Sequence, residues 1–174
     1  MRTPYVLASL VALGLAACSI TAPTDKPHAT AHLQPIGDSK VTGKAKFAQH
    51  KEGQMYISAV VHGLKPNAEH GFHIHENGSC QDSGNAAGGH FNPVQSPHGK
   101  YDQPLHHAGD LPSLKADANG VATVNVLVPG LSLQQGNTNV VNRALIVHAQ
   151  PDDYTSQPSG NAGARIACGI IQLR

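Results

Sequence analysis

Two histidines alternate with apolar residues in the stretch GFHIHENGSC, at positions 71–80. On a β-strand, successive side chains point to opposite faces, so His73 and His75 share one face. Phe72 and Ile74 then share the other, apolar face. Buried imidazoles need partners for their ring nitrogens, and a metal ion is one way to supply them. The pattern predicts a core strand that also carries a binding site.

Other segments alternate or contain β-branched residues, and turn sequences such as KPNAEHG and KADANG separate them. No segment keeps the 3.6-residue period of a helix. The expected strands are 40–49, 55–64, 70–76, 121–128, 144–149 and 165–173. An all-β Greek-key antiparallel sandwich or flattened barrel follows, as one domain over residues 31–174.

Two long segments, 78–112 and 151–163, fit no strand. Long loops inside a compact domain are usually functional or disordered. The first contains many of the chain's twelve histidines, which favours function. The formal net charge of +1 gives no general electrostatic case for binding nucleic acid.

The N-terminal segment has the features of an export signal. Residues 1–17 combine an early arginine with a short apolar run that ends in small residues. The run ends LAAC, which resembles the bacterial lipobox and makes Cys18 the lipidated mature N-terminus. The alternative is an ordinary secretory signal with an incidental cysteine. Residues 18–30 form a Thr/Pro-rich tether, and Ser19 favours sorting to the outer membrane.

The remaining cysteines form an even pair if Cys18 is lipidated. In an oxidising compartment we expect Cys80 and Cys168 to form a disulfide, which could contribute ~4 kcal/mol by closing a long loop. The alternative, two free thiols acting as soft metal ligands, suits the cytoplasm better than an exported protein.

Candidate metal donors occur on two of the predicted strands and in the first long loop. They are His73, His75 and His148 on strands and His90, His98, His107 and Asp110 in the loop. Three histidines with an aspartate are an ordinary set for tetrahedral zinc. Strand-borne histidines in a rigid, near-planar arrangement suit Cu(II).

The motifs GFHIHE, AGGHFNP, HAGDLP, LIVHA and GNAGARIACGII occur in this order. In these motifs the chain resembles the copper/zinc superoxide dismutases, in their bacterial periplasmic form. The resemblance implies a copper site and a zinc site bridged by His90. Copper would be held by His73, His75, His90 and His148, and zinc by His90, His98, His107 and Asp110.

The resemblance also implies roles for residues that are not ligands. Arg165 would sit beside the copper and attract superoxide, and Asp152 would hydrogen-bond ligand histidines on both metals. The spacing His-x-Gly-Asp selects His107 as the ligand rather than its neighbour His106. Lys100 is a candidate for steering the substrate, against the alternative of a solvated surface lysine.

The function implied is dismutation of superoxide to oxygen and hydrogen peroxide, protecting the periplasm or cell envelope. Copper would cycle between oxidation states, and His90 would help to deliver protons. A non-catalytic module that binds or delivers copper or zinc is the alternative, and loss of a copper ligand or of Arg165 would indicate it. A zinc hydrolase with an open site is a second alternative. The family includes monomers and dimers, which leaves a homodimer open.

Overall fold

The computed structural model describes residues 27–51 and 53–174. The predicted signal segment 1–17, Cys18 and the tether up to residue 26 lie outside the described residues. Strand β1 (His28–Pro35) is the first described element, and its first residues overlap the predicted tether 18–30. No helix within the described ranges has the length and apolar character needed to cross a membrane.

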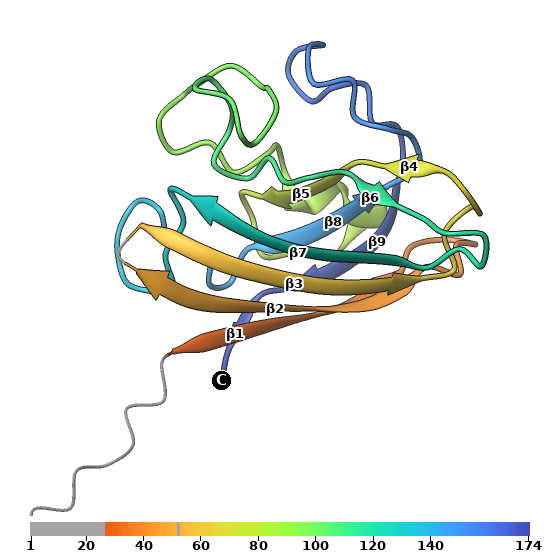
Figure 1. Cartoon of the computed structure of the whole chain (residues 1–174), viewed down its shortest axis with the longest axis horizontal. Helices are drawn as coiled ribbons and strands as arrows, with labels where there is room; N and C mark the ends of the chain where they lie inside the picture. The colour runs from red at the N-terminus through yellow and green to blue at the C-terminus, as the bar shows by residue number, and fades with distance from the viewer. Residues whose placement is uncertain (1–26, 52) are drawn as a thin grey trace, which may run out of the picture.

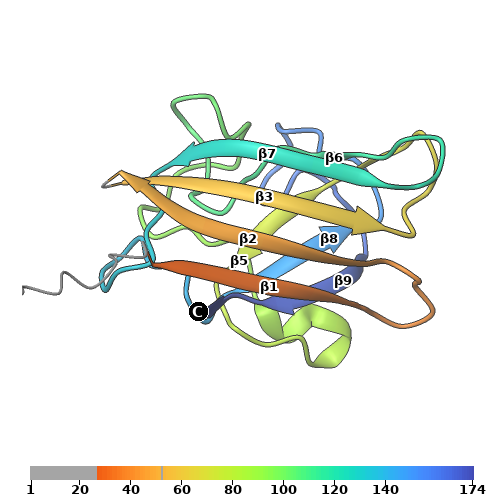
Figure 2. The same cartoon turned by 60° about the horizontal axis from the view of Figure 1, so that its bottom comes forward.

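One curled antiparallel sheet makes up most of the fold (Figures 1 and 2), with the strand order β5-β8-β9-β1-β2-β3-β7 and β10 paired to β1. Its strands are β1, β2 (Thr42–Lys51), β3 (Gln54–His62), β5 (Phe72–His75), β7 (Ala122–Pro129), β8 (Ala144–His148), β9 (Arg165–Ile170) and β10 (Gln172–Leu173). Strands β1, β2 and β3 form a meander, whereas β3 to β5, β5 to β7 and β7 to β8 cross between the ends of the sheet. The all-β Greek-key prediction is confirmed.

Alternation along β2 and β3 places one face of each strand in the core. Phe47 and Ile57 are fully buried, whereas their neighbours Lys46 and Tyr56 are exposed. The core lies inside the curled sheet, where residues from β2 and β3 pack in one cluster with Phe72 of β5. Strands β5 and β8 differ because both of their faces are buried. The two long loops lie on the same side of the molecule, beside β5 and β8 (Figure 1), and account for the second buried face.

Several elements depart from the expected strands. The segment 70–76 divides into β4 (Glu69–His70) and β5, and 165–173 divides into β9 and β10. A short 3₁₀ segment (Asp82–Ala87) and β6 (Leu114–Lys115), which pairs with β4, lie inside or just after the first long loop and were not predicted. Strand β1 was missed because its buried positions, apart from Leu33, are small or weakly apolar residues that give little alternation signal.

The first loop attaches to the free edge of β5. Ile74 donates its N–H to the carbonyl of Gly109 at 2.9 Å, and Phe91 donates its N–H to the carbonyl of Ile74 at 2.8 Å. A Cβ atom on Gly109 would lie 2.1 Å from the Ile74 carbonyl oxygen, so only glycine allows this close approach. The attachment places His90 and Asp110 beside the histidines of β5.

Candidate metal centre

The histidines of β5 and β8 face the loops and not the core. In the antiparallel pairing of these strands, His73 lies opposite Ile146 and His75 opposite Ala144. Residues directly opposite each other share a face of the sheet. His148 shares that face by alternation from Ile146, while the intervening Val147 packs in the core. The face predicted for His73 and His75 therefore also carries His148.

A first cluster combines these strand histidines with a loop histidine. One ring nitrogen from each of His73, His75, His90 and His148 lies within 4.8 Å of the others, and all four residues are buried. In three of the rings, the nitrogen that points away from the other rings has a hydrogen-bond partner. His75 Nδ1 donates to the Gly88 carbonyl at 2.9 Å, His148 Nδ1 donates to the Gly163 carbonyl at 3.1 Å, and His73 Nε2 lies 2.7 Å from Asp152.

These hydrogen bonds fix which nitrogens face one another. Because a carbonyl only accepts, His75 and His148 carry their protons on Nδ1 and present lone pairs from Nε2. The two Nε2 atoms are 3.3 Å apart. His73 Nδ1 and His90 Nε2 are buried without any hydrogen-bond partner. Two facing lone pairs and two unpartnered buried nitrogens need a cation to be satisfied.

A second cluster forms around the carboxylate of Asp110. Its Oδ1 lies 2.8 Å from His90 Nδ1, 3.0 Å from His98 Nδ1 and 3.6 Å from His107 Nδ1. His107 Nδ1 is another buried nitrogen without a partner. The other oxygen, Oδ2, accepts the backbone N–H of His107 at 2.8 Å and of Gly99 at 3.2 Å. Three imidazole nitrogens therefore converge on one carboxylate oxygen.

Burial keeps His73, His75 and His148 of the first cluster neutral. Desolvation is the main cause that lowers the pKa of His73 to about 4, of His75 to about 2 and of His148 to about 3. Neutral imidazoles offer lone pairs to a metal at neutral pH. In the second cluster, burial opposes the charge on His98, but hydrogen bonds to Asp110 and Asp152 outweigh it and raise the pKa of His98 to about 9.

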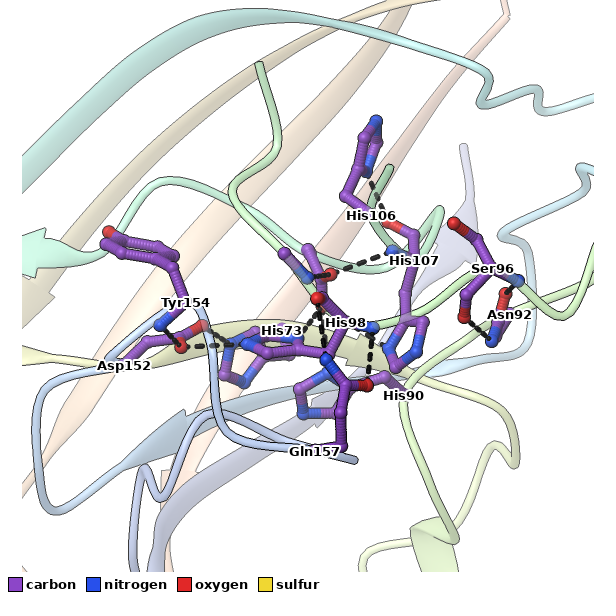
Figure 3. A network of polar contacts seen from close by, with 12 residues as sticks. His73, His90, Asn92, Ser96, His98, His106, His107, Asp152, Tyr154 and Gln157 are labelled. Carbon is purple, nitrogen blue, oxygen red and sulfur yellow. Dashed lines mark hydrogen bonds and ion pairs between the residues drawn. The ribbon is translucent and has the colours of Figure 1, made fainter. Parts of the chain in front are cut away.

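Asp152, for which the family resemblance implied hydrogen bonds to ligand histidines of both metals, joins the two clusters. Its Oδ2 lies 2.7 Å from His73 Nε2 and its Oδ1 lies 2.9 Å from His98 Nε2 (Figure 3). The backbone N–H of Tyr154 donates to Oδ1 at 2.8 Å. Despite the cost of burial, hydrogen bonds from these partners hold the pKa of Asp152 below its usual range. One carboxylate thus orients a ring in each cluster.

Arg165 lies at the edge of the first cluster. It pairs with His148 across β8 and β9, and its charge contributes to the lowered pKa of His75 and of His148. Its guanidinium donates to the carbonyl oxygens of Gly84 and Gly88 in the first loop. This two-point attachment gives the half-buried cation a defined position.

The predicted disulfide between Cys80 and Cys168 is confirmed. The Cα atoms of the two cysteines are 5.8 Å apart. Cys168 belongs to β9, and Cys80 precedes the segment whose carbonyls hold Arg165. The bond therefore ties the loop that positions Arg165 to the strand that carries Arg165.

Some other candidates lie outside the clusters. His106 turns away and donates from Nδ1 to the carbonyl of His107 at 2.6 Å (Figure 3). Lys100 forms an ion pair with Asp102 at 3.2 Å, which reduces its value for steering an anion. Gln157 and Tyr154, whose side chains link the second loop to the first, were not predicted, because polar residues in a polar loop give no pattern.

Comparison with known proteins decides the family. The family model for copper/zinc superoxide dismutase (SODC) matches residues 41–171. The chain belongs to the copper/zinc superoxide dismutase family. Enzymes of this family use copper and zinc, and these ions are the cofactors of this dismutase.

Several relatives of this dismutase are bacterial. Superoxide dismutase (Cu–Zn) 2 of Aquifex aeolicus is 43% identical over 148 residues, covering 82% of this chain and 86% of the relative. The superoxide dismutase-like protein YojM of Bacillus subtilis is 37% identical, covering 98% and 96%. Among solved structures, the clock protein EA4 superposes with a TM-score of 0.77 at 32% identity, covering 87% of this chain and 97% of that protein.

The donor sets of this dismutase fit the two ions. Four imidazoles with lone pairs or unpartnered nitrogens suit copper, and three imidazole nitrogens around a carboxylate suit tetrahedral zinc. Three of the four buried side-chain nitrogens without partners, on His73, His90 and His107, belong to these sets, whereas the fourth, His70 Nε2, belongs to neither. The type and arrangement of the donor atoms therefore match copper in the first cluster and zinc in the second.

Proposed function

We propose that this chain dismutates superoxide to oxygen and hydrogen peroxide at a paired copper and zinc centre, and that it protects the cell envelope. The observation that carries the proposal is the position of His90. Its Nδ1 lies 2.8 Å from Asp110 in the second cluster, and its Nε2 belongs to the first cluster. A single ring therefore connects the two donor sets.

The proposed ligand atoms follow from the hydrogen bonds already made. Copper would be held by His73 Nδ1 and the Nε2 atoms of His75, His90 and His148. Zinc would be held by the Nδ1 atoms of His90, His98 and His107 with Asp110 Oδ1. Copper supplies the one-electron redox chemistry and zinc a fixed positive charge. The chain supplies the anion site and the proton.

His90 is the residue to which we assign proton delivery. Hydrogen peroxide carries protons that superoxide lacks, so the site must supply them. The Nε2 atom of His90 is buried and unpartnered, and it can hold a proton while Nδ1 keeps its place beside Asp110. The second cluster therefore fixes the ring, so that Nε2 could carry a proton whenever it is not bound to copper.

Arg165 is the proposed docking group for superoxide. An arginine stays charged at neutral pH and suits an anion. Segment 151–163 contains Asp152 and Asp153 but no lysine or arginine, and Lys100 is paired with Asp102. Attraction of the substrate at this rim therefore depends mainly on Arg165.

Replacing Arg165 should separate its charge from its geometry. We expect Arg165→Ile to lower kcat/KM for superoxide about tenfold and to flatten its dependence on ionic strength, because the local cation is lost. Arg165→Lys should keep the salt dependence but recover only part of the rate, since lysine lacks the fork that holds Gly84 and Gly88. Pulse radiolysis at several salt concentrations, with metal content checked, measures both. An unchanged rate in Arg165→Ile would remove the docking role.

Metal removal tests the proposed function. Purified protein should contain copper and zinc and consume superoxide; selective removal of copper should abolish consumption, and copper but not zinc should restore it. The non-catalytic alternative predicts bound copper without superoxide consumption. The complete first cluster and the adjacent Arg165 favour the enzyme.

We place the enzyme in the periplasm, anchored by lipidated Cys18. The LAAC sequence supports this placement. Fractionation of cells that express Cys18→Ser beside the unaltered chain tests it. Loss of membrane association and of the lipid mass on the mature protein is expected only in the variant. A soluble, unlipidated product from the unaltered chain would contradict the anchor.

A further inference from the structure

The buried backbone of His98 needs partners that regular secondary structure does not supply. Residues 95–100 belong to no helix or strand, and His98 is 4% exposed. Its N–H donates to Gln157 Oε1 at 2.9 Å, and its carbonyl accepts from Gln157 Nε2 at 3.0 Å (Figure 3). One side-chain amide therefore pairs with both backbone polar groups of His98, as an adjacent strand would.

The same loop also holds the ring of His98. Asp152 Oδ1 lies 2.9 Å from His98 Nε2, while Asp110 Oδ1 lies 3.0 Å from His98 Nδ1. Gly160 packs over this contact, because a Cβ atom there would lie 2.6 Å from His98 Nε2 and 1.8 Å from Asp152 Oδ1. Segment 151–163 thus contacts His98 at its backbone and at the ring nitrogen opposite the second cluster.

We infer that Gln157 is a positioning residue for the zinc half of the centre. By hydrogen-bonding both backbone groups of His98, the Gln157 amide fixes the position of the His98 backbone. Asp152 then fixes the orientation of the ring. A ring anchored only through Asp152 could pivot about that contact and move Nδ1 away from the other donors. The inference rests on the proposed ligand role of His98.

A second contact between the loops provides a matched control. Tyr154 donates its hydroxyl to Ser113 Oγ at 2.7 Å, so its side chain also ties segment 151–163 to the residue just after the first loop. Among the hydrogen bonds of the described residues, none joins the Tyr154 side chain to His98. If Gln157 merely tethered the loop, Tyr154→Phe would have the same effect as removing the Gln157 amide. If Gln157 positions His98, only the second change disturbs the zinc donors.

The test compares Gln157→Met, which keeps side-chain length without the amide, with Tyr154→Phe and with Gln103→Met at an exposed position of the first loop. We expect Gln157→Met to release zinc to a chromogenic chelator about tenfold faster or more. Its cobalt-substituted form should show altered d–d absorption, and the His98 amide should lose its protection from hydrogen exchange. The two control variants should match the unaltered protein in all three readouts.

Two results would overturn the inference: unchanged zinc release in Gln157→Met, or an equal effect in Tyr154→Phe. If Gln157→Met does not fold, hydrogen exchange in the unaltered protein tests the inference instead. Fast exchange of the His98 amide would show that its hydrogen bond to Gln157 does not persist, and would overturn the inference. Failure of the proposed function would be seen separately, as unaltered protein that binds both metals but does not consume superoxide.

Discussion

Replacing His148 with alanine is expected to remove copper and dismutase activity while zinc stays bound. The His148 ring belongs to the first cluster alone. Among the ion pairs of the described residues, none joins His148 to Asp110. Without it, the facing pair of Nε2 atoms becomes a single donor at His75. Loss of a direct ligand should exceed the 10- to 100-fold typical of outer partners, so we expect copper affinity and activity to fall by about 100-fold or more.

The matched control for this variant is His106→Ala. His106 lies next to a proposed zinc ligand in sequence, but its ring bonds to the His107 carbonyl outside both clusters. It should keep both metals and full activity. Elemental analysis and the copper absorption spectrum, read beside a superoxide assay, distinguish the variants. Copper-dependent activity that survived in His148→Ala would show that the other three histidines suffice.

Alternation made strands β2, β3 and β7 predictable, because each of them has one buried and one more exposed face. Strand β3 shows this, with Met55 and Ile57 buried on either side of exposed Tyr56. Strand β1 escaped prediction for the opposite reason. Its buried positions include Ala29 and Ala31, which gain little from burial and contrast weakly with their polar neighbours. Strand pairing with β2 and β9 holds this segment, and pairing is not visible locally.

The strand histidines were predictable from period, but their convergence with the loop donors was not. His73 and His75 share a face by strand geometry alone, whereas His90 reaches them through an isolated bridge between His75 and His90. That bridge depends on the close approach of Gly109 to β5, a contact between distant segments. Family resemblance supplied the bridging role in advance. Neither alternation nor the family motifs indicate Gln157, whose amide contacts the backbone of a residue in another loop.

Asp110→Asn should remove zinc before copper. The asparagine side chain has nearly the same shape as the aspartate, but its amide cannot satisfy both sides of the site. If its oxygen faces the imidazole nitrogens, its NH₂ meets the backbone N–H groups of His107 and Gly99, which are donors. If the amide flips, its NH₂ occupies the ring lone pairs that zinc requires. Either orientation blocks the site or leaves buried donors unpaired.

We expect this variant to lose zinc affinity by about 100-fold or more and to lose about 3 kcal/mol of folding stability in the metal-free state, because a buried charge pair is broken. Copper binding should survive at first, since Asp110 is not in the first cluster. Competition with a zinc chelator measures the affinity, and denaturant unfolding of the metal-free proteins measures the stability. The absence of tetrahedral cobalt bands in the substituted variant would identify the lost site.

Asp117→Asn separates the two roles that Asp110 combines. Asp117 also accepts two backbone N–H groups, from Asn119 and Val121, but it is exposed and has no imidazole partner among the described residues. A small stability loss with unchanged zinc is expected there, because only the backbone contacts are affected. If Asp110→Asn also kept its zinc, three imidazoles would be sufficient ligands, and the carboxylate would serve only to cap the loop backbone. Joint loss of zinc and of the cobalt bands in Asp110→Asn, against retention in Asp117→Asn, would assign the fourth donor to Asp110.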